Sequence, residues 1–196
     1  IWNILGISLA TIGKIDKAIE VFKKVILLNS NFIEAYLNLG KALNTIGDFD
    51  QAIKIYNQIL SINPYTTNAH FSIGDIHYNK GNFEQAIESY YKVLAIKPDN
   101  VEAFNSIGTA LKNQKKFSES IDFYNKAIAL DPSYAEAYNN LGTVLYEKED
   151  HKKALIAYNK AIKINPEFAQ AYYNKANILK LYDKKKRAKA NFKKAI

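Results

Sequence analysis

Residues 33–66 contain two stretches in which apolar side chains recur every three or four positions, as on one face of a helix. The first stretch has Tyr36, Leu39, Leu43 and Ile46, and the second has Ile53, Tyr56, Ile59 and Leu60. Between them, Gly47 and Asp48 predict a turn and a helix N-cap, and Pro64 ends the second stretch. The pattern predicts two antiparallel helices of about 13 residues each. No alternating strand pattern occurs anywhere in the chain.

The same pattern repeats every 34 residues without a slip. All four prolines follow this period. Two further sets of equivalent positions, one per repeat, share it, and we call each such set a column. The prolines are Pro64, Pro98, Pro132 and Pro166; the glycine column is Gly6, Gly40, Gly74, Gly108 and Gly142; the small-residue column is Ala18, Ala52, Ala86, Ser120, Ala154 and Ala188. We therefore predict one array over 1–196, with repeats at 1–32 (partial), 33–66, 67–100, 101–134, 135–168 and 169–196 (partial). Because residue 1 already lies inside a repeat, we interpret the chain as a fragment of a longer protein.

The glycine column predicts close contact between helices. Glycine inside a helix costs about 1 kcal/mol relative to alanine, so five in one register imply a repeated benefit. We expect the small-residue column of the second helix to be the partner. Aromatic columns are expected to fill the remaining space, with one such column formed by Phe22, Tyr56, Tyr90, Tyr124, Tyr158 and Phe192.

Trp2-x-x-Leu5-Gly6-x-x-Leu9 followed by Ala18-x-x-x-Phe22 resembles the tetratricopeptide repeat, and the resemblance covers the whole chain. Departures are few: Ser30, Ala176, Lys185 and Lys189 occupy columns that hold proline, glycine or large apolar residues elsewhere. The resemblance implies an all-α, right-handed α–α superhelix, a solenoid of about six stacked helix–turn–helix units. The first helices would line a concave groove that binds an extended peptide or a partner protein.

Asparagine dominates the first-helix positions that would face this groove. We predict a peptide-binding face that comprises Asn38, Lys41, Asn44, Asp75, Tyr78, Asn105, Thr109, Lys112, Asn139, Asn140, Thr143, Tyr146, Asn174 and Asn177, with Asn3 at its start. An amide both donates and accepts hydrogen bonds, so a row of them suits a peptide backbone. The set partly resembles the asparagine ladder of glycosyltransferases that add N-acetylglucosamine to Ser/Thr, but Ser72 and Ser106 interrupt it. The alternative is that these asparagines are neutral surface residues.

Some tetratricopeptide domains clamp a C-terminal carboxylate with fixed Lys, Asn and Arg side chains on successive first helices. Here Lys41 is followed one repeat later by Asp75, and no arginine precedes Arg187. We therefore do not expect a carboxylate clamp.

The sequence predicts no catalytic residue, metal site or cofactor, and no small-molecule substrate. There is no cysteine, no glycine-rich phosphate loop and no nucleophile–base pair. His70, His77 and His151 occupy aromatic or leucine columns, so we interpret them as packing residues. An enzyme domain joined to the array is possible by family resemblance, and it would make this chain a substrate-recruiting arm.

The net charge of +8 comes from one terminal cluster. Residues 169–196 hold nine of the 27 basic residues and one acid, so residues 1–168 are neutral with 18 of each. The cluster at 184–194 could contact nucleic acid or an anionic surface. No aromatic residues that could stack on bases are interleaved with it, so we favour the interpretation that it is a solvated helix. No signal peptide or membrane-spanning run is present, and we expect a cytoplasmic protein, although its compartment and oligomeric state stay open.

The function that these patterns favour is a protein–protein interaction module. Two alternatives stay open: the substrate-recruiting arm of a larger enzyme such as a glycosyltransferase, and a structural subunit that packs into a larger assembly. We also expect 169–196 to be the least stable repeat, because lysines replace apolar residues in its second helix.

Overall fold

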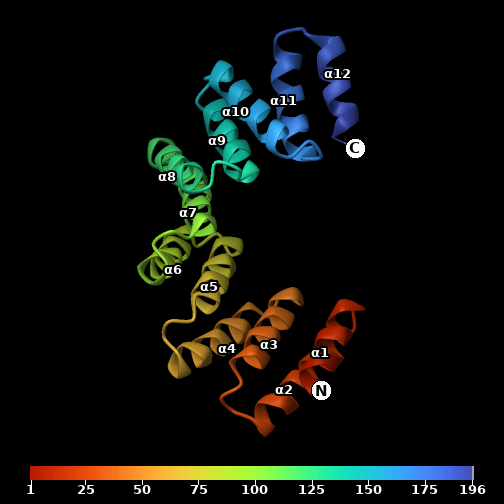
Figure 1. The fold of residues 1–196 in the computed structure, drawn as a ribbon, viewed down its shortest axis with the longest axis vertical. Helices are drawn as coiled ribbons and strands as arrows, with labels where there is room; N and C mark the ends of the chain where they lie inside the picture. Colours follow the sequence, from red (N-terminus) through yellow and green to blue (C-terminus); the bar gives the residue numbers. More distant parts are fainter. Residues whose placement is uncertain (196) are drawn as a thin grey trace. The chain divides into compact units, whose positions relative to one another are not determined.

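The computed structural model describes residues 1–195, which form twelve α-helices and no strand (Figure 1). The helices are α1 (Trp2–Thr11), α2 (Ile15–Leu28), α3 (Ile33–Thr45), α4 (Phe49–Ile62), α5 (Thr67–Asn79), α6 (Phe83–Ile96), α7 (Val101–Asn113), α8 (Phe117–Leu130), α9 (Ala135–Glu147), α10 (His151–Ile164), α11 (Ala169–Leu181) and α12 (Lys185–Lys194). The odd-numbered helices from α3 onward begin at the first residue of each predicted repeat. The predicted all-α class and the helix-pair repeat are therefore confirmed.

The helices group into two compact units, residues 1–98 and 99–196, and each contains three helix pairs. Within each unit a first helix packs against its own second helix, and that second helix packs against the next first helix. Every first helix except α1 and α7 thus has a second helix on both sides within its unit. The repeat period itself runs across the boundary unchanged.

The turn inside each pair has the same backbone conformation in all six repeats. Gly13, Gly47 and Gly81 have φ between 77° and 80°, the left-handed region that glycine enters without strain. In the last three repeats Lys115, Glu149 and Asp183 adopt this conformation instead. The turn is thus a property of the fold, and glycine is the residue best suited to it.

The predicted N-cap at the start of α4 is present, since the Asp48 carboxylate accepts a hydrogen bond from the Gln51 amide at 3.3 Å. Asp150 caps α10 in the same way, at 3.1 Å from the Lys153 amide.

The glycine column makes room for a ring rather than for the small-residue column. A Cβ atom added to Gly108 would lie 2.8 Å from the Tyr124 ring, and a Cβ on any of the other four glycines would lie within 2.7 Å of the ring in the same column. Our expectation of small residues packed on small residues was therefore incomplete. The small column lies beside this contact and is fully buried at Ser120, whose hydroxyl donates to the Gly108 carbonyl at 2.7 Å.

The last helix contributes little to the core. Among the described residues of α12 only Ala188 is buried, and Lys185 and Lys189 are exposed. In the same repeat Ala176 replaces the column glycine and is fully buried. The sequence departures of this repeat thus coincide with its thinner packing.

Candidate functional site

Three pairs of asparagines bridge successive first helices. The two residues of each pair are 35 apart, one more than the repeat period. The side-chain amide of the later asparagine donates to the carbonyl oxygen of the earlier one, which lies on the first helix of the preceding repeat. The Nδ2–Oδ1 distances are 3.2 Å for Asn38 to Asn3, 3.0 Å for Asn140 to Asn105 and 2.9 Å for Asn174 to Asn139. The structure thus pairs six of the asparagines that the sequence placed on one face, two in unit 1 and four in unit 2. We call these six the amide row.

The amide row has a fixed orientation because its members are part-buried and hydrogen-bonded to one another. Sequence reasoning treated them as exposed side chains and missed this pairing. The signal was present as the 35-residue offset between asparagines in neighbouring repeats. Each donating amide uses one N–H for its bridge and has a second N–H and a carbonyl oxygen.

The amide row is interrupted between α3 and α5, where Leu37 and Ser72 take the places of the two asparagines. A pocket of about 500 Å³ opens there. Its lining includes the predicted residues Asn38, Lys41, Asn44 and Asp75, together with Leu37, Phe71 and Ser72. The interruption that the sequence showed is therefore a recess in the surface.

Several other predicted residues are hydrogen-bonded within their own repeat. In three repeats the second-helix tyrosine that faces the column glycine donates a hydrogen bond from its hydroxyl to a polar side chain on the first helix. The bonds are Tyr90 to Asp75 (2.8 Å), Tyr124 to Thr109 (3.1 Å) and Tyr158 to Thr143 (3.4 Å). Burial raises the pKa of Asp75, and the Tyr90 hydrogen bond partly opposes that rise. Burial also raises the pKa of Tyr158, to about 12. Asp75, Thr109 and Thr143 therefore orient the rings that cover the glycine column.

Tyr78 and Tyr146 pack at the start of the second helix of their own repeats. The Tyr78 ring centre lies 5.6 Å from that of Phe83, and Tyr146 stacks on His151 at 5.2 Å. The Oδ1 atom of Asn44 is buried and has no hydrogen-bond partner in the described part of the chain. Among the predicted residues, Lys41 is exposed, while Lys112 and Asn177 are half-buried.

The three histidines are dispersed over three sites. His70 Nε2 lies 3.0 Å from the Pro64 carbonyl, and His151 contacts the Tyr182 hydroxyl at 3.3 Å. His77 has a buried Nδ1 without a hydrogen-bond partner among the described residues. Burial lowers the pKa of His77, Lys80 lowers it further, and Glu88 partly opposes both effects. Within residues 1–195, no group of three His, Asp or Glu side chains is arranged to hold a metal ion.

A lysine that sequence reasoning did not single out lies near the basic cluster at 184–194. Lys175 occupies the column of Leu5, Leu39, Ile73, Ile107 and Leu141. Burial lowers its pKa, and Arg187 and Lys194 lower it further. Lys194 also lies over the Tyr172 ring, 5.3 Å from its centre. The signal for Lys175 was the break in a leucine column. None of the helices within residues 1–195 is long and apolar enough to cross a membrane.

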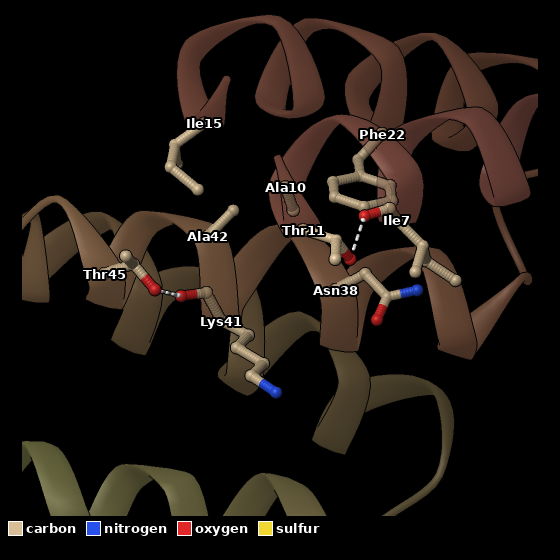
Figure 2. Close-up of a pocket in the computed structure, with 9 residues that line it drawn as sticks. All are labelled: Ile7, Ala10, Thr11, Ile15, Phe22, Asn38, Lys41, Ala42 and Thr45. Atoms are coloured by element: carbon tan, nitrogen blue, oxygen red, sulfur yellow. Dashed lines mark hydrogen bonds between the residues drawn. The ribbon is translucent and has the colours of Figure 1, made fainter. Parts of the chain in front are cut away.

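A second pocket in unit 1 lies beside the 500 Å³ pocket, between α1, α2 and α3 (Figure 2). Its volume is about 270 Å³. The lining is Ile7, Ala10, Thr11, Ile15, Phe22, Asn38, Lys41, Ala42 and Thr45. Asn38 and Lys41 line this pocket and also the larger one, so the two pockets are neighbours along α3.

Comparison with known families and structures gives a consistent result. Tetratricopeptide repeat models match residues 12–70, 74–115, 108–148, 135–168 and 157–190. A search of curated protein sequences found no match.

Solved structures supply further relatives. A crystal structure of MamA is 33% identical, with a TM-score of 0.67, and the match covers 80% of this chain and 92% of that one. PilF of Pseudomonas aeruginosa shares the fold at 15% identity, with a TM-score of 0.81 and coverage of 97% and 86%. YrrB, described as a tetratricopeptide protein with an unusual peptide-binding site, has 22% identity, a TM-score of 0.63 and coverage of 89% and 90%.

The family models together cover most of the chain, and the helix pairs follow the 34-residue period of that family. The chain has the architecture of a helical solenoid that serves as a protein–protein interaction module. It belongs to the tetratricopeptide repeat family.

Proposed function

We propose that each unit binds an extended segment of a partner protein along its own part of the amide row. The observation that carries this proposal is the hydrogen bonding of asparagines between successive first helices at 2.9 to 3.2 Å. These bonds fix the amides before any ligand arrives, and preorganised groups lose less conformational freedom on binding. The second N–H groups of the donating amides and the carbonyl oxygens of Asn38 and Asn140 match the donors and acceptors of a peptide backbone. The Asn174 carbonyl already accepts a hydrogen bond from Gln170 Nε2 at 3.0 Å.

Two further observations support an extended peptide as the ligand. The three bridges share one spacing of 35 residues, one bridge in unit 1 and two at consecutive junctions in unit 2, which suits a ligand that is itself periodic. Two pockets interrupt or flank the row in unit 1, where they could receive side chains of the same ligand. The relative YrrB is described as having a peptide-binding site, which agrees with this class of ligand.

The test replaces Asn38, Asn105, Asn140 and Asn174 together by alanine. We expect binding of a synthetic nonapeptide library, measured by fluorescence anisotropy, to weaken at least tenfold, because each lost hydrogen bond contributes roughly 0.5–1.5 kcal/mol. The variant is also expected to unfold more easily, since three bridges between helices are lost. Binding is therefore measured where circular dichroism shows that the variant is folded.

The matched control replaces Asn57, Asn125 and Asn159, which are exposed and share one column on the second helices. This control should bind the library like the unmodified chain. Undiminished binding by the folded four-asparagine variant would refute the proposal.

A further inference from the structure

The first repeat differs at one contact from the third, fourth and fifth repeats. In three later repeats the second-helix tyrosine bonds to a polar side chain of the first helix. In the first repeat Phe22 stands in the tyrosine column and Ile7 in the column of Asp75, Thr109 and Thr143. Both partners of the hydrogen bond are replaced at once, so the contact becomes apolar without an orphaned polar group.

This exchange lines the pocket shown in Figure 2 with apolar groups. Phe22 and Ile15 come from α2, Ile7 and Ala10 from α1, and Ala42 from α3. The two threonines at its edge have their hydroxyls bonded within their own helices, Thr11 to the Ile7 carbonyl and Thr45 to the Lys41 carbonyl, each at 2.9 Å. Their hydroxyl groups are therefore already satisfied and do not demand a polar ligand.

The apolar lining is accessible from outside. Phe22 is nearly fully buried, but Ile7 keeps 40% of its surface exposed on the first-helix face. The pocket volume of about 270 Å³ lies just below the roughly 300–1,000 Å³ of sites that enclose a small organic ligand. This size suits a single side chain better than a whole small molecule.

The rim of the pocket is polar and carries one cation. Asn38, a member of the amide row, and Lys41 stand between this pocket and the larger one next to it. Lys41 is exposed and takes part in none of the three salt bridges found within the described residues. A carboxylate on the ligand would gain a charge-assisted bond here without displacing an existing partner.

We propose that this pocket selects an apolar side chain, branched or aromatic, of an extended peptide, and that Lys41 selects an acidic residue next to it. The inference rests on the proposed function, since it assumes that a peptide backbone lies along the amide row. It adds the chemistry of the ligand: an apolar residue adjacent to Asp or Glu. The two pockets share Asn38 and Lys41, so one nine-residue extended peptide of about 30 Å can lie over both.

The experiment measures sequence preference rather than affinity alone. A positional-scanning library of synthetic nonapeptides is bound to the complete 196-residue chain. We expect enrichment of Leu, Ile or Phe at one position and of Asp or Glu beside it. Thr11→Phe, which fills the pocket from the exposed end of α1, should reduce the apolar preference at least tenfold. Ile7→Asn should do the same by making the lining polar, and Lys41→Glu should reverse the acidic preference.

Matched controls place the same changes elsewhere in unit 1. Asn79→Phe is the equivalent of Thr11→Phe at the end of α5, and Lys54→Glu reverses a charge on the exposed side of α4. Both controls should keep the preferences of the unmodified chain.

The outcomes separate the two proposals. Library binding without an apolar or acidic preference, or a preference that survives Thr11→Phe and Ile7→Asn, would overturn the inference and leave the amide row as a binding site. Failure of the unmodified chain to bind any nonapeptide would overturn the proposed function and this inference with it.

Discussion

At the scale of single residues, the contact between the column glycine and the ring above it organises each helix pair. The rings of Tyr90, Tyr124 and Tyr158 are buried, and their hydroxyls are held by Asp75, Thr109 and Thr143. A ring fixed at both its edge and its hydroxyl cannot move aside to admit a methyl group. The glycine is thus required by packing rather than by backbone conformation.

Gly108→Ala tests this requirement, because two effects of opposite sign compete. Alanine would raise helix propensity by about 1 kcal/mol. Overpacking a fixed core group typically costs about 1–3 kcal/mol, and the added Cβ would stand 2.8 Å from Tyr124. We expect net destabilisation of about 1 kcal/mol, measured by urea unfolding.

If Gly108→Ala stabilised the chain instead, the Tyr124 ring would have to shift freely, and packing against the ring would not explain why glycine recurs in this column. Gly142→Ala, opposite Tyr158 at 2.6 Å, is the replicate in the next repeat.

At the scale of elements, α5 differs from the other first helices in carrying a histidine at a core column. His77 stands where Leu43, Leu111, Leu145 and Leu179 occur in other repeats. Its buried Nδ1 has no hydrogen-bond partner among the described residues. Burial therefore lowers its pKa below the ordinary 6.5, and the folded state favours the neutral ring.

The sign of the pH effect follows from linkage. Well above pH 6.5 the ring is neutral in both states, and stability does not depend on its protonation. As pH falls from 6.5 through the lower folded pKa, the unfolded chain binds the proton more readily, and stability is lost.

We expect His77→Leu to remove this loss and to stabilise the chain by about 1 kcal/mol at pH 7, because no buried nitrogen is left unsatisfied. Urea unfolding from pH 7.5 to pH 5 measures both effects. Leu111→His, the converse change in α7, should introduce the same acid sensitivity. Equal pH dependence of His77→Leu and the unmodified chain would contradict the explanation.

At the scale of the whole molecule, stability comes from nearest-neighbour packing within two units. Internal helices pack on both sides, whereas α12 packs on α11. Its described residues bury only Ala188. Within the described part of the chain, its one salt bridge is Lys185 to Asp183, at 3.2 Å. The last repeat therefore contributes least to unit 2.

We expect residues 169–195 to exchange their amide protons fastest in unit 2 of the 196-residue chain, because local opening there exposes little apolar surface. Hydrogen–deuterium exchange followed by mass spectrometry would compare this segment with residues 101–134. Equal protection of the two segments would indicate that another molecule or segment packs onto α12.

The sequence by itself determined the repeat, its pair of helices and its turn, and it predicted an asparagine-rich face. These features depend on local chemistry and on a 34-residue period, both of which are visible along the chain: Gly47 and Asp48 mark the turn, and the prolines mark the repeat. Only the tertiary structure decided what those residues touch. It placed the Tyr124 ring over Gly108, where we had expected the small-residue column, and paired Asn140 with Asn105. It also turned the paired exchange of Ile7 and Phe22 into an accessible apolar pocket. The physical reason is that contacts between helices depend on how their side chains interlock, and a one-dimensional period does not specify that arrangement.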